Sequence, residues 1–258
     1  MTLQPETVCF ACLALGQKYR RLAKQLAADF GRFAPDYHLL MGTDVPSDFA
    51  ELSNVEAFLL KSRGILHCYH DKRFLIERGL AQFQTVILTD ADSRLTGQIF
   101  LDDEAEPGVY GIFTSNVVKH SQRYNPARLK FFRRLAKKLD FDLEQATFVG
   151  ESLFAVCAPP PQANAFLENW DKMARYLELN GVHAGEGNVI GMAALKAELP
   201  IRSAEWLEQI GKVCEHMDAS QEKKTVGFFQ RLQKRVRYHL RLNQARFFAL
   251  GDFRFFYR

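Results

Sequence analysis

The chain of 258 residues has no apolar run as long as the ~18 residues that a membrane-spanning helix needs. It also lacks a P-loop (GxxxxGK followed by Ser or Thr), an HExxH pair and a GxSxG elbow. These absences disfavour P-loop ATPases, zincins and hydrolases with a nucleophile elbow. No basic stretch precedes an apolar segment near Met1. We therefore expect no secretory signal and a cytoplasmic protein.

Cysteine is scarce, with five residues and hence an odd number. Cys9 and Cys12 form a CxxC spacing, but they fall within a strand-like run and no second pair accompanies them. This pattern favours buried, reduced thiols over a disulfide framework or a zinc site. Hydrophobic residues make up 47% of the chain and charged residues 25%, which is typical of a globular protein with a sizeable core.

The first third of the chain alternates short apolar runs with helical periodicity, which predicts a mainly parallel sheet flanked by helices. Strands are expected over 8–15, 38–41, 65–69 and 85–89, and helices over 18–30 and 70–83. The later part predicts a strand over 109–113 and, as a strand pair or one bent strand, strands over 146–150 and 152–157. It also predicts helices over 125–139, 162–179 and 186–199, and short elements over 204–217. The fold class is thus α/β, with a basic helical C-terminal tail.

Two carboxylates follow the apolar run 85–89, at Asp90 and Asp92. Ligands of open α/β sheets bind outside the carboxyl ends of strands, so these side chains are placed where chemistry is usually done. A hard divalent cation held by one or two carboxylates keeps positions open for substrate phosphates. The pattern predicts a Mn²⁺ or Mg²⁺ site, with a solvated turn as the alternative.

The order of elements, together with a few short segments, resembles a known class of enzymes. The segments are 14–19 (ALGQKY), the DxD at 90–92, 148–154 (FVGESLF) and 180–188 (NGVHAGEGN). The chain resembles the GT-A fold glycosyltransferases, and most closely glycosyltransferase family six, the family of the blood-group A/B and α-1,3-galactosyltransferases. Its soluble bacterial members fit this chain best.

The resemblance implies a GT-A-like (Rossmann-like) catalytic domain over 1–222. Residues 8–92 would form the half that binds the nucleotide sugar, and 93–222 the half that binds the acceptor. The implied activity is metal-dependent transfer of a hexose from a nucleoside-diphosphate sugar to a glycan or glycolipid hydroxyl. Retention at the anomeric carbon is implied by the resemblance alone.

The same resemblance suggests roles for individual residues. Asp92 would bind the metal directly, and Asp90 would bind the metal or the donor ribose or sugar. Glu186 would be the nucleophile or the electrostatic partner of the anomeric carbon, although a glutamate that starts a helix is also favoured by the helix dipole. His183 would bind an acceptor hydroxyl or simply lie on the turn.

Two further positions are candidates for donor binding. Tyr19 follows the first strand and would stack on the base or ribose, or it would be the first core residue of its helix. Arg73 or Lys72, on the helix before the DxD strand, would reach the donor phosphates or sugar. A solvated helix face is the alternative for these two.

The segment 223–258 holds ten basic residues and one acidic residue, a net charge of +9, which leaves a net −5 on the rest of the chain. Phe228, Leu232, Val236 and Leu240 recur every four residues within it. A basic amphipathic helix with aromatics suits an anionic membrane surface, here the inner face of the membrane. The alternative is that the apolar stripe packs on the domain.

Two other functions stay open from the sequence. The basic aromatic tail would also suit a non-catalytic nucleic-acid-binding protein, although the body is acidic and no RNP1 signature is present. Another metal-dependent enzyme, such as a nucleotidyltransferase, usually carries a Gly-rich phosphate loop. Gly16 is a single glycine in this region, and the lack of a Gly-rich loop disfavours a nucleotidyltransferase.

Overall fold

A computed structural model of the chain describes residues 1–217, 219 and 227–258. Its centre is a seven-stranded sheet with the order β10-β6-β9-β4-β1-β2-β3. All neighbouring strands in it run parallel, except that β9 is antiparallel to both β4 and β6. The strands are β1 (Val8–Ala14), β2 (His38–Thr43), β3 (Val55–Leu59), β4 (Thr85–Asp90), β6 (Gly108–Gly111), β9 (Leu153–Cys157) and β10 (Ile201–Arg202).

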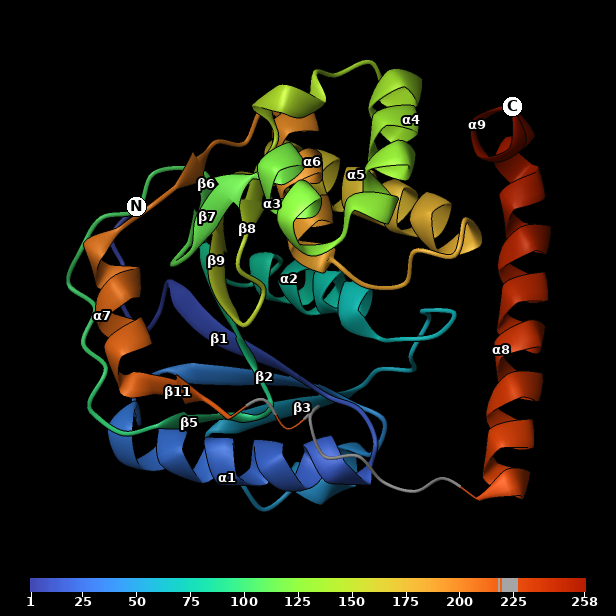
Figure 1. The fold of residues 1–258 in the computed structure, drawn as a ribbon. Coiled ribbons are helices and arrows are strands. Elements are labelled where there is room, and N and C mark those ends of the chain that lie inside the picture. The colour runs from blue at the N-terminus through green and yellow to red at the C-terminus, as the bar shows by residue number, and fades with distance from the viewer. Residues whose placement is uncertain (218, 220–226) are drawn as a thin grey trace.

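Helices cover both faces of this sheet, so the predicted α/β class is confirmed (Figure 1). One face packs against α2 (Lys72–Leu80), α3 (Val117–Tyr124), α4 (Leu129–Leu139), α5 (Pro160–Leu179) and α6 (Glu186–Lys196). The other face packs against α1 (Gln17–Phe33) and α7 (Glu205–Val213). Two-stranded sheets pair β5 (Ser93–Leu95) with β11 (Cys214–His216) and β7 (Thr114–Asn116) with β8 (Thr147–Val149).

Strand β1 shows how the two cores are divided. Successive side chains of a strand point to opposite faces, and Cys9 and Ala11 enter one core whereas Phe10 and Cys12 enter the other. Cys9 and Cys12 are therefore both buried, on opposite sides of the sheet. Their CxxC spacing cannot bring the two sulfur atoms together, and the prediction of buried, reduced thiols is confirmed for both.

One strand prediction was wrong. Residues 65–69 do not form a strand but lead into the short 3-10 helix Tyr69–Asp71, and the strand beside β2 is instead β3. Strand β3 lies at the edge of the sheet and is only half-buried, so its sequence lacks a clear alternation. The strands predicted over 146–150 and 152–157 are present as β8 and β9, but they do not pair with each other: β8 pairs with β7, whereas β9 joins the central sheet.

The C-terminal segment forms α8 (Phe228–Ala249), a 3-10 turn (Leu250–Asp252) and α9 (Phe253–Tyr257). Figure 1 shows α8 as a long helix along one side of the body, with α9 at its end. Phe255 of α9 lies against the Tyr176 ring of α5, and Lys172 pairs with Asp252 at 3.1 Å. Most of 218–226 and the side chain of Phe228 lie outside the described residues. Within the described part, no helix has both the length and the apolarity to cross a bilayer.

Candidate functional site

Asp90 ends the central strand β4 and faces α2. Val86 and Leu88 point into the core that α2 covers, and Asp90 shares their face because side chains alternate along a strand. Asp90 thus meets α2 at its first residue, Lys72. The Nζ of Lys72 lies 2.7 Å from the Oδ1 of Asp90.

Lys72 is buried and joins three segments that are far apart in the sequence. Besides Asp90, its ammonium lies 2.7 Å from the Oε1 of Glu186 and donates to the carbonyl of Glu151 at 2.8 Å. Burial on its own would lower the pKa of Lys72, but the attraction of Asp90 and Glu186 outweighs burial and raises the pKa. Lys72 thus forms the centre of a cluster of ionisable side chains.

Glu186 reaches Lys72 because helix α6 begins at this residue. The preceding Gly185 has a φ of 94°, a left-handed conformation that favours glycine. Gly187 lets the helix approach closely, since a Cβ there would lie 2.1 Å from the carbonyl of Val149. Burial raises the pKa of Glu186 to about 7 despite the lowering effect of Lys72.

Glu151 belongs to the same cluster, because its carbonyl accepts the hydrogen bond from the Lys72 ammonium. Burial raises its pKa, with Lys72 acting in the lowering direction. Its Oε2 atom is buried and has no hydrogen-bond partner among the described residues. A Cβ on Gly187 would lie 2.5 Å from this oxygen, so Glu151 also faces the start of α6.

Asp92 forms a second, adjoining group with His216. Strand β11 pairs antiparallel with β5, and the register sets His216 opposite Ser93, next to Asp92 in the chain. The Nδ1 of His216 lies 3.7 Å from the Oδ1 of Asp92. The Oδ2 of Asp92 accepts a hydrogen bond from the backbone N–H of Ala219 at 2.8 Å. Asp92 is itself buried.

Asp90, Asp92 and His216 each offer one ligand atom, and these atoms all lie within 4.8 Å of one another. Carboxylates suit Mg²⁺ and Mn²⁺, and the imidazole adds a donor that the harder Mg²⁺ uses less. The residues therefore fit a divalent cation of the Mn²⁺ type. Three protein ligands would leave coordination positions for substrate oxygens.

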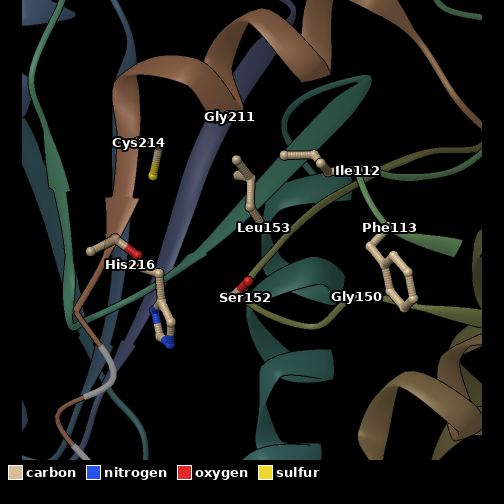
Figure 2. Close-up of a pocket in the computed structure, with 9 residues that line it drawn as sticks. Ile112, Phe113, Gly150, Ser152, Leu153, Gly211, Cys214 and His216 are labelled. Carbon is tan, nitrogen blue, oxygen red and sulfur yellow. The ribbon is translucent and has the colours of Figure 1, made fainter.

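A pocket of about 140 Å³ opens beside this group (Figure 2). Cys214 and His216 of β11 lie on one side of it, and Ile112 and Phe113 lie on the opposite side. Ser152 lines the pocket as well. The pocket is smaller than the ~300 Å³ at which drug-sized ligand sites begin, so it would enclose one small group rather than a whole nucleotide sugar.

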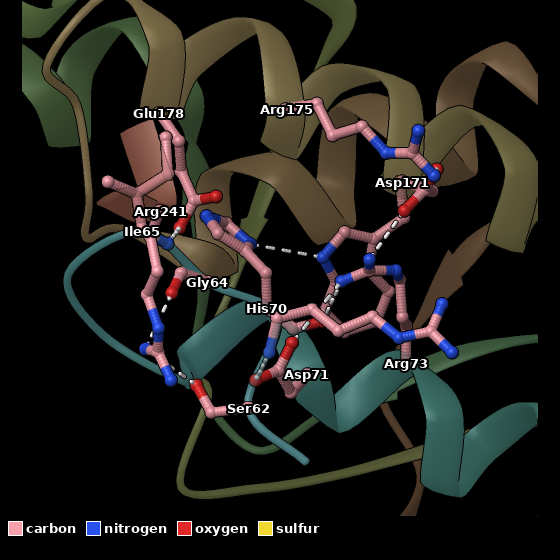
Figure 3. A network of polar contacts seen from close by, with 12 residues as sticks. Ser62, Gly64, Ile65, His70, Asp71, Arg73, Asp171, Arg175, Glu178 and Arg241 are labelled. Carbon is pink, nitrogen blue, oxygen red and sulfur yellow. Dashed lines mark hydrogen bonds and ion pairs between the residues drawn. The ribbon is translucent and has the colours of Figure 1, made fainter. Parts of the chain in front are cut away.

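The structure does not bring every predicted residue to this cluster. Arg73 is buried on the other side of α2, where its guanidinium donates to the carbonyl of His70 at 2.6 Å and pairs with Asp171 (Figure 3). His183 stacks edge-on against Tyr238 of α8. Tyr19 is half-buried in the first turn of α1 and packs against the core. Of the two cations weighed on α2, Lys72 is the one that lies at Asp90.

The Arg73 network borders a cavity of about 460 Å³ between α5, α8 and the loop 62–65. Arg241 of α8 donates to the carbonyl of Gly64 at 3.0 Å (Figure 3). The indole N–H of Trp170 donates to the Nδ1 of His70 at 3.1 Å, and burial lowers the pKa of His70 to about 3. His70 is therefore a neutral acceptor that holds the start of α2 against α5.

Glu178 on α5 provides a test of this network. Burial raises its pKa from 4.5 to about 7, although its Oε1 accepts a hydrogen bond from Ile65 N–H at 3.2 Å. A raised carboxyl pKa means that the folded state binds more protons between these values, so stability falls as pH rises from 4.5 to 7. Glu178→Gln, which keeps the acceptor, is expected to be about 3 kcal/mol more stable than the parent at pH 8 and nearly equal to it at pH 4.5.

Urea unfolding at the two pH values measures this difference. Glu168→Gln, at an exposed position of the same helix, is the matched control and should change little at either pH. A Glu178→Gln variant with the same pH dependence as the parent would show that folding does not raise the pKa of Glu178.

Three members of the cluster were not assigned from the sequence. Glu151 and His216 were overlooked, and Lys72 was considered only as a donor-binding alternative to Arg73. A search for charged side chains directly after strand ends would have drawn attention to Glu151, which follows β8 by two residues. No spacing pattern marks His216, because its place depends on the pairing of β11 with β5.

Comparison with known proteins adds no family to this description. No protein-family model matches the chain, and no curated protein matches it in sequence. The fold and the cluster define a mixed α/β protein with a candidate divalent-cation site at the carboxyl end of a central parallel strand.

Proposed function

We propose that this protein is a metal-dependent glycosyltransferase with a GT-A-like fold. It would move a sugar from a nucleoside-diphosphate sugar to a hydroxyl group of a glycan or glycolipid. The observation that supports this proposal best is the convergence of Asp90, Asp92 and His216 at the end of β4. Through Asp90, this group directly adjoins the buried pair of Lys72 and Glu186.

The chemistry needs two things that these residues can supply. When the sugar–phosphate bond breaks, negative charge develops on the leaving nucleoside diphosphate. Asp90, Asp92 and His216 would hold a Mn²⁺ or Mg²⁺ ion that neutralises this charge. The ammonium of Lys72, next to Asp90, would add positive charge on the same side.

Positive charge develops at the anomeric carbon in the same step. Carboxylates nearby stabilise an oxocarbenium-like centre or attack it. Glu186 and Glu151 both face Lys72, and burial raises the pKa of each. One of these carboxylates would stabilise or attack the anomeric carbon of the sugar. The acceptor hydroxyl would lose its proton to a carboxylate or to the leaving phosphate. We retain Glu186 for this role, with Glu151 as the neighbouring alternative.

A thermal-shift panel of nucleotide sugars, each with Mn²⁺, Mg²⁺ or chelator, tests the proposal. A donor at a hundredfold excess over its dissociation constant should raise the melting temperature by about 5 °C or more. The shift should need the metal and should be lost in Asp92→Asn. A shift with nucleoside triphosphates but with no nucleotide sugar would favour a nucleotidyltransferase, and no shift with any nucleotide would contradict both.

A further inference from the structure

Helix α8 carries an exposed apolar face. Phe229, Leu232, Val236, Leu240 and Phe247 are 82%, 49%, 50%, 65% and 71% exposed. At about 100° per residue, their spacings of three, four, four and seven residues set all five on one side of the helix. We call these five residues the outer stripe of α8. Soluble monomers rarely expose a continuous apolar surface of this kind without a partner.

The opposite side of α8 is the one that contacts the body. Tyr238 lies against the His183 ring, and Arg241 donates to the carbonyl of Gly64. Leu242 and Ala249 are buried. The sequence left open whether the apolar residues of this segment pack on the domain. In the structure α9 packs on the body, whereas Leu232, Val236 and Leu240 of α8 are exposed.

Basic side chains flank the outer stripe. Arg235 and Arg246 lie on one flank and Arg237 on the other, as the helical angles require, and all three are exposed. Residues 227–258 contain eight basic residues and a single acid, Asp252. A second copy of the chain that packed stripe against stripe would bring these like charges together. The occupant that complements this surface is therefore apolar at its centre and anionic at its rim.

We propose that α8 docks with its outer stripe on an anionic lipid bilayer. The helix would lie along the surface, with the stripe at the boundary between headgroups and acyl chains. Arg235, Arg237 and Arg246 would contact lipid phosphates. This inference is independent of the proposed transferase activity, because it depends only on the surface of α8.

Docking in this way would also orient the body. Through Tyr238, α8 contacts the loop that precedes Glu186, and through Arg241 it contacts the loop that precedes Lys72. Both loops lie between the lipid-facing helix and the candidate site. The side of the body that carries these loops would therefore face the membrane.

Co-sedimentation of the full chain with vesicles tests the proposal. One set of vesicles contains phosphatidylcholine alone, and the other also contains phosphatidylglycerol. We expect binding to the anionic vesicles and release at high salt. Leu232→Ser/Val236→Ser/Leu240→Ser and Arg235→Gln/Arg237→Gln/Arg246→Gln should each weaken binding by about a hundredfold.

Leu59→Ser/Phe100→Ser/Tyr124→Ser is the matched control, because these exposed apolar residues lie on the body, outside the two loops that α8 contacts. It should bind like the parent, and circular dichroism should show all three variants folded. Equal binding by the serine variant of α8 and the parent would overturn the proposal. Absence of binding to anionic vesicles would overturn it too, as would a dimer in light scattering that the serine variant of α8 abolishes.

Discussion

Under the proposed function, replacement of Asp92 by asparagine is expected to lower the rate of sugar transfer by about a thousandfold, because a metal ion held there would contribute several kcal/mol of transition-state stabilisation. The amide keeps an oxygen that can accept the hydrogen bond from Ala219 N–H. The fold should therefore survive while a metal-binding charge is lost. Transfer assays with saturating donor and calorimetric titration of Mn²⁺ measure the two effects separately.

The control for this experiment is Asp102→Asn. Asp102 is an exposed aspartate in the loop after β5, and its loss should change neither the transfer rate nor Mn²⁺ affinity. A folded Asp92→Asn variant that binds Mn²⁺ and transfers sugar at the parental rate would refute the assignment of the metal site. If Mn²⁺ binding fell while transfer stayed normal, the site would be a cation site without a role in the reaction.

The second large effect concerns stability. Lys72→Met is expected to lower the free energy of unfolding at pH 7.5 by about 3–5 kcal/mol, because it leaves the buried carboxylate of Glu186 and the partly exposed carboxylate of Asp90 without their cation. Asp90 and Glu186 are both 2.7 Å from the Lys72 ammonium. The pKa of Glu186 is already about 7, and without Lys72 it would rise further. Protonation of Glu186 should then reduce the loss as the pH falls toward 5.

A double-mutant cycle separates the ion pair from simple loss of packing. Glu186→Gln in the Lys72→Met background should recover about 2 kcal/mol, because it removes one uncompensated charge. Lys196→Met, an exposed lysine at the end of α6, should change stability by less than about 0.5 kcal/mol. Urea unfolding provides all of these values. A Lys72→Met variant as stable as the parent at pH 7.5 would show that the cluster does not depend on this lysine.

Hydrophobic periodicity predicted the strands and helices whose pattern of buried residues is clear. The buried strand 85–89 and the amphipathic helix 162–179 appear in the structure as β4 and α5. Their burial is complete on the relevant faces, so their hydrophobic patterns are unambiguous. Strand β3 was missed because it lies at a half-buried edge, where the pattern of apolar residues is weak.

The candidate site was only partly predictable, because some of its residues come together through contacts between distant segments. Asp90 and Asp92 could be found because they directly follow a buried strand. Glu186 was assigned through the resemblance, and the structure places it on Lys72. His216 and Glu151 join the cluster only through contacts between segments that are distant in the chain, such as the pairing of β11 with β5.

By itself, the sequence determined the alternating α/β architecture, the position of the paired aspartates at the end of β4 and the basic, aromatic character of the C-terminal segment. These properties follow from local patterns of burial and charge. Only the tertiary structure decided which charged groups meet at Lys72, that His216 joins Asp92, and that α8 turns its apolar stripe away from the body. Such choices depend on strand register and on which face of each helix is buried, and neither is encoded within a single segment.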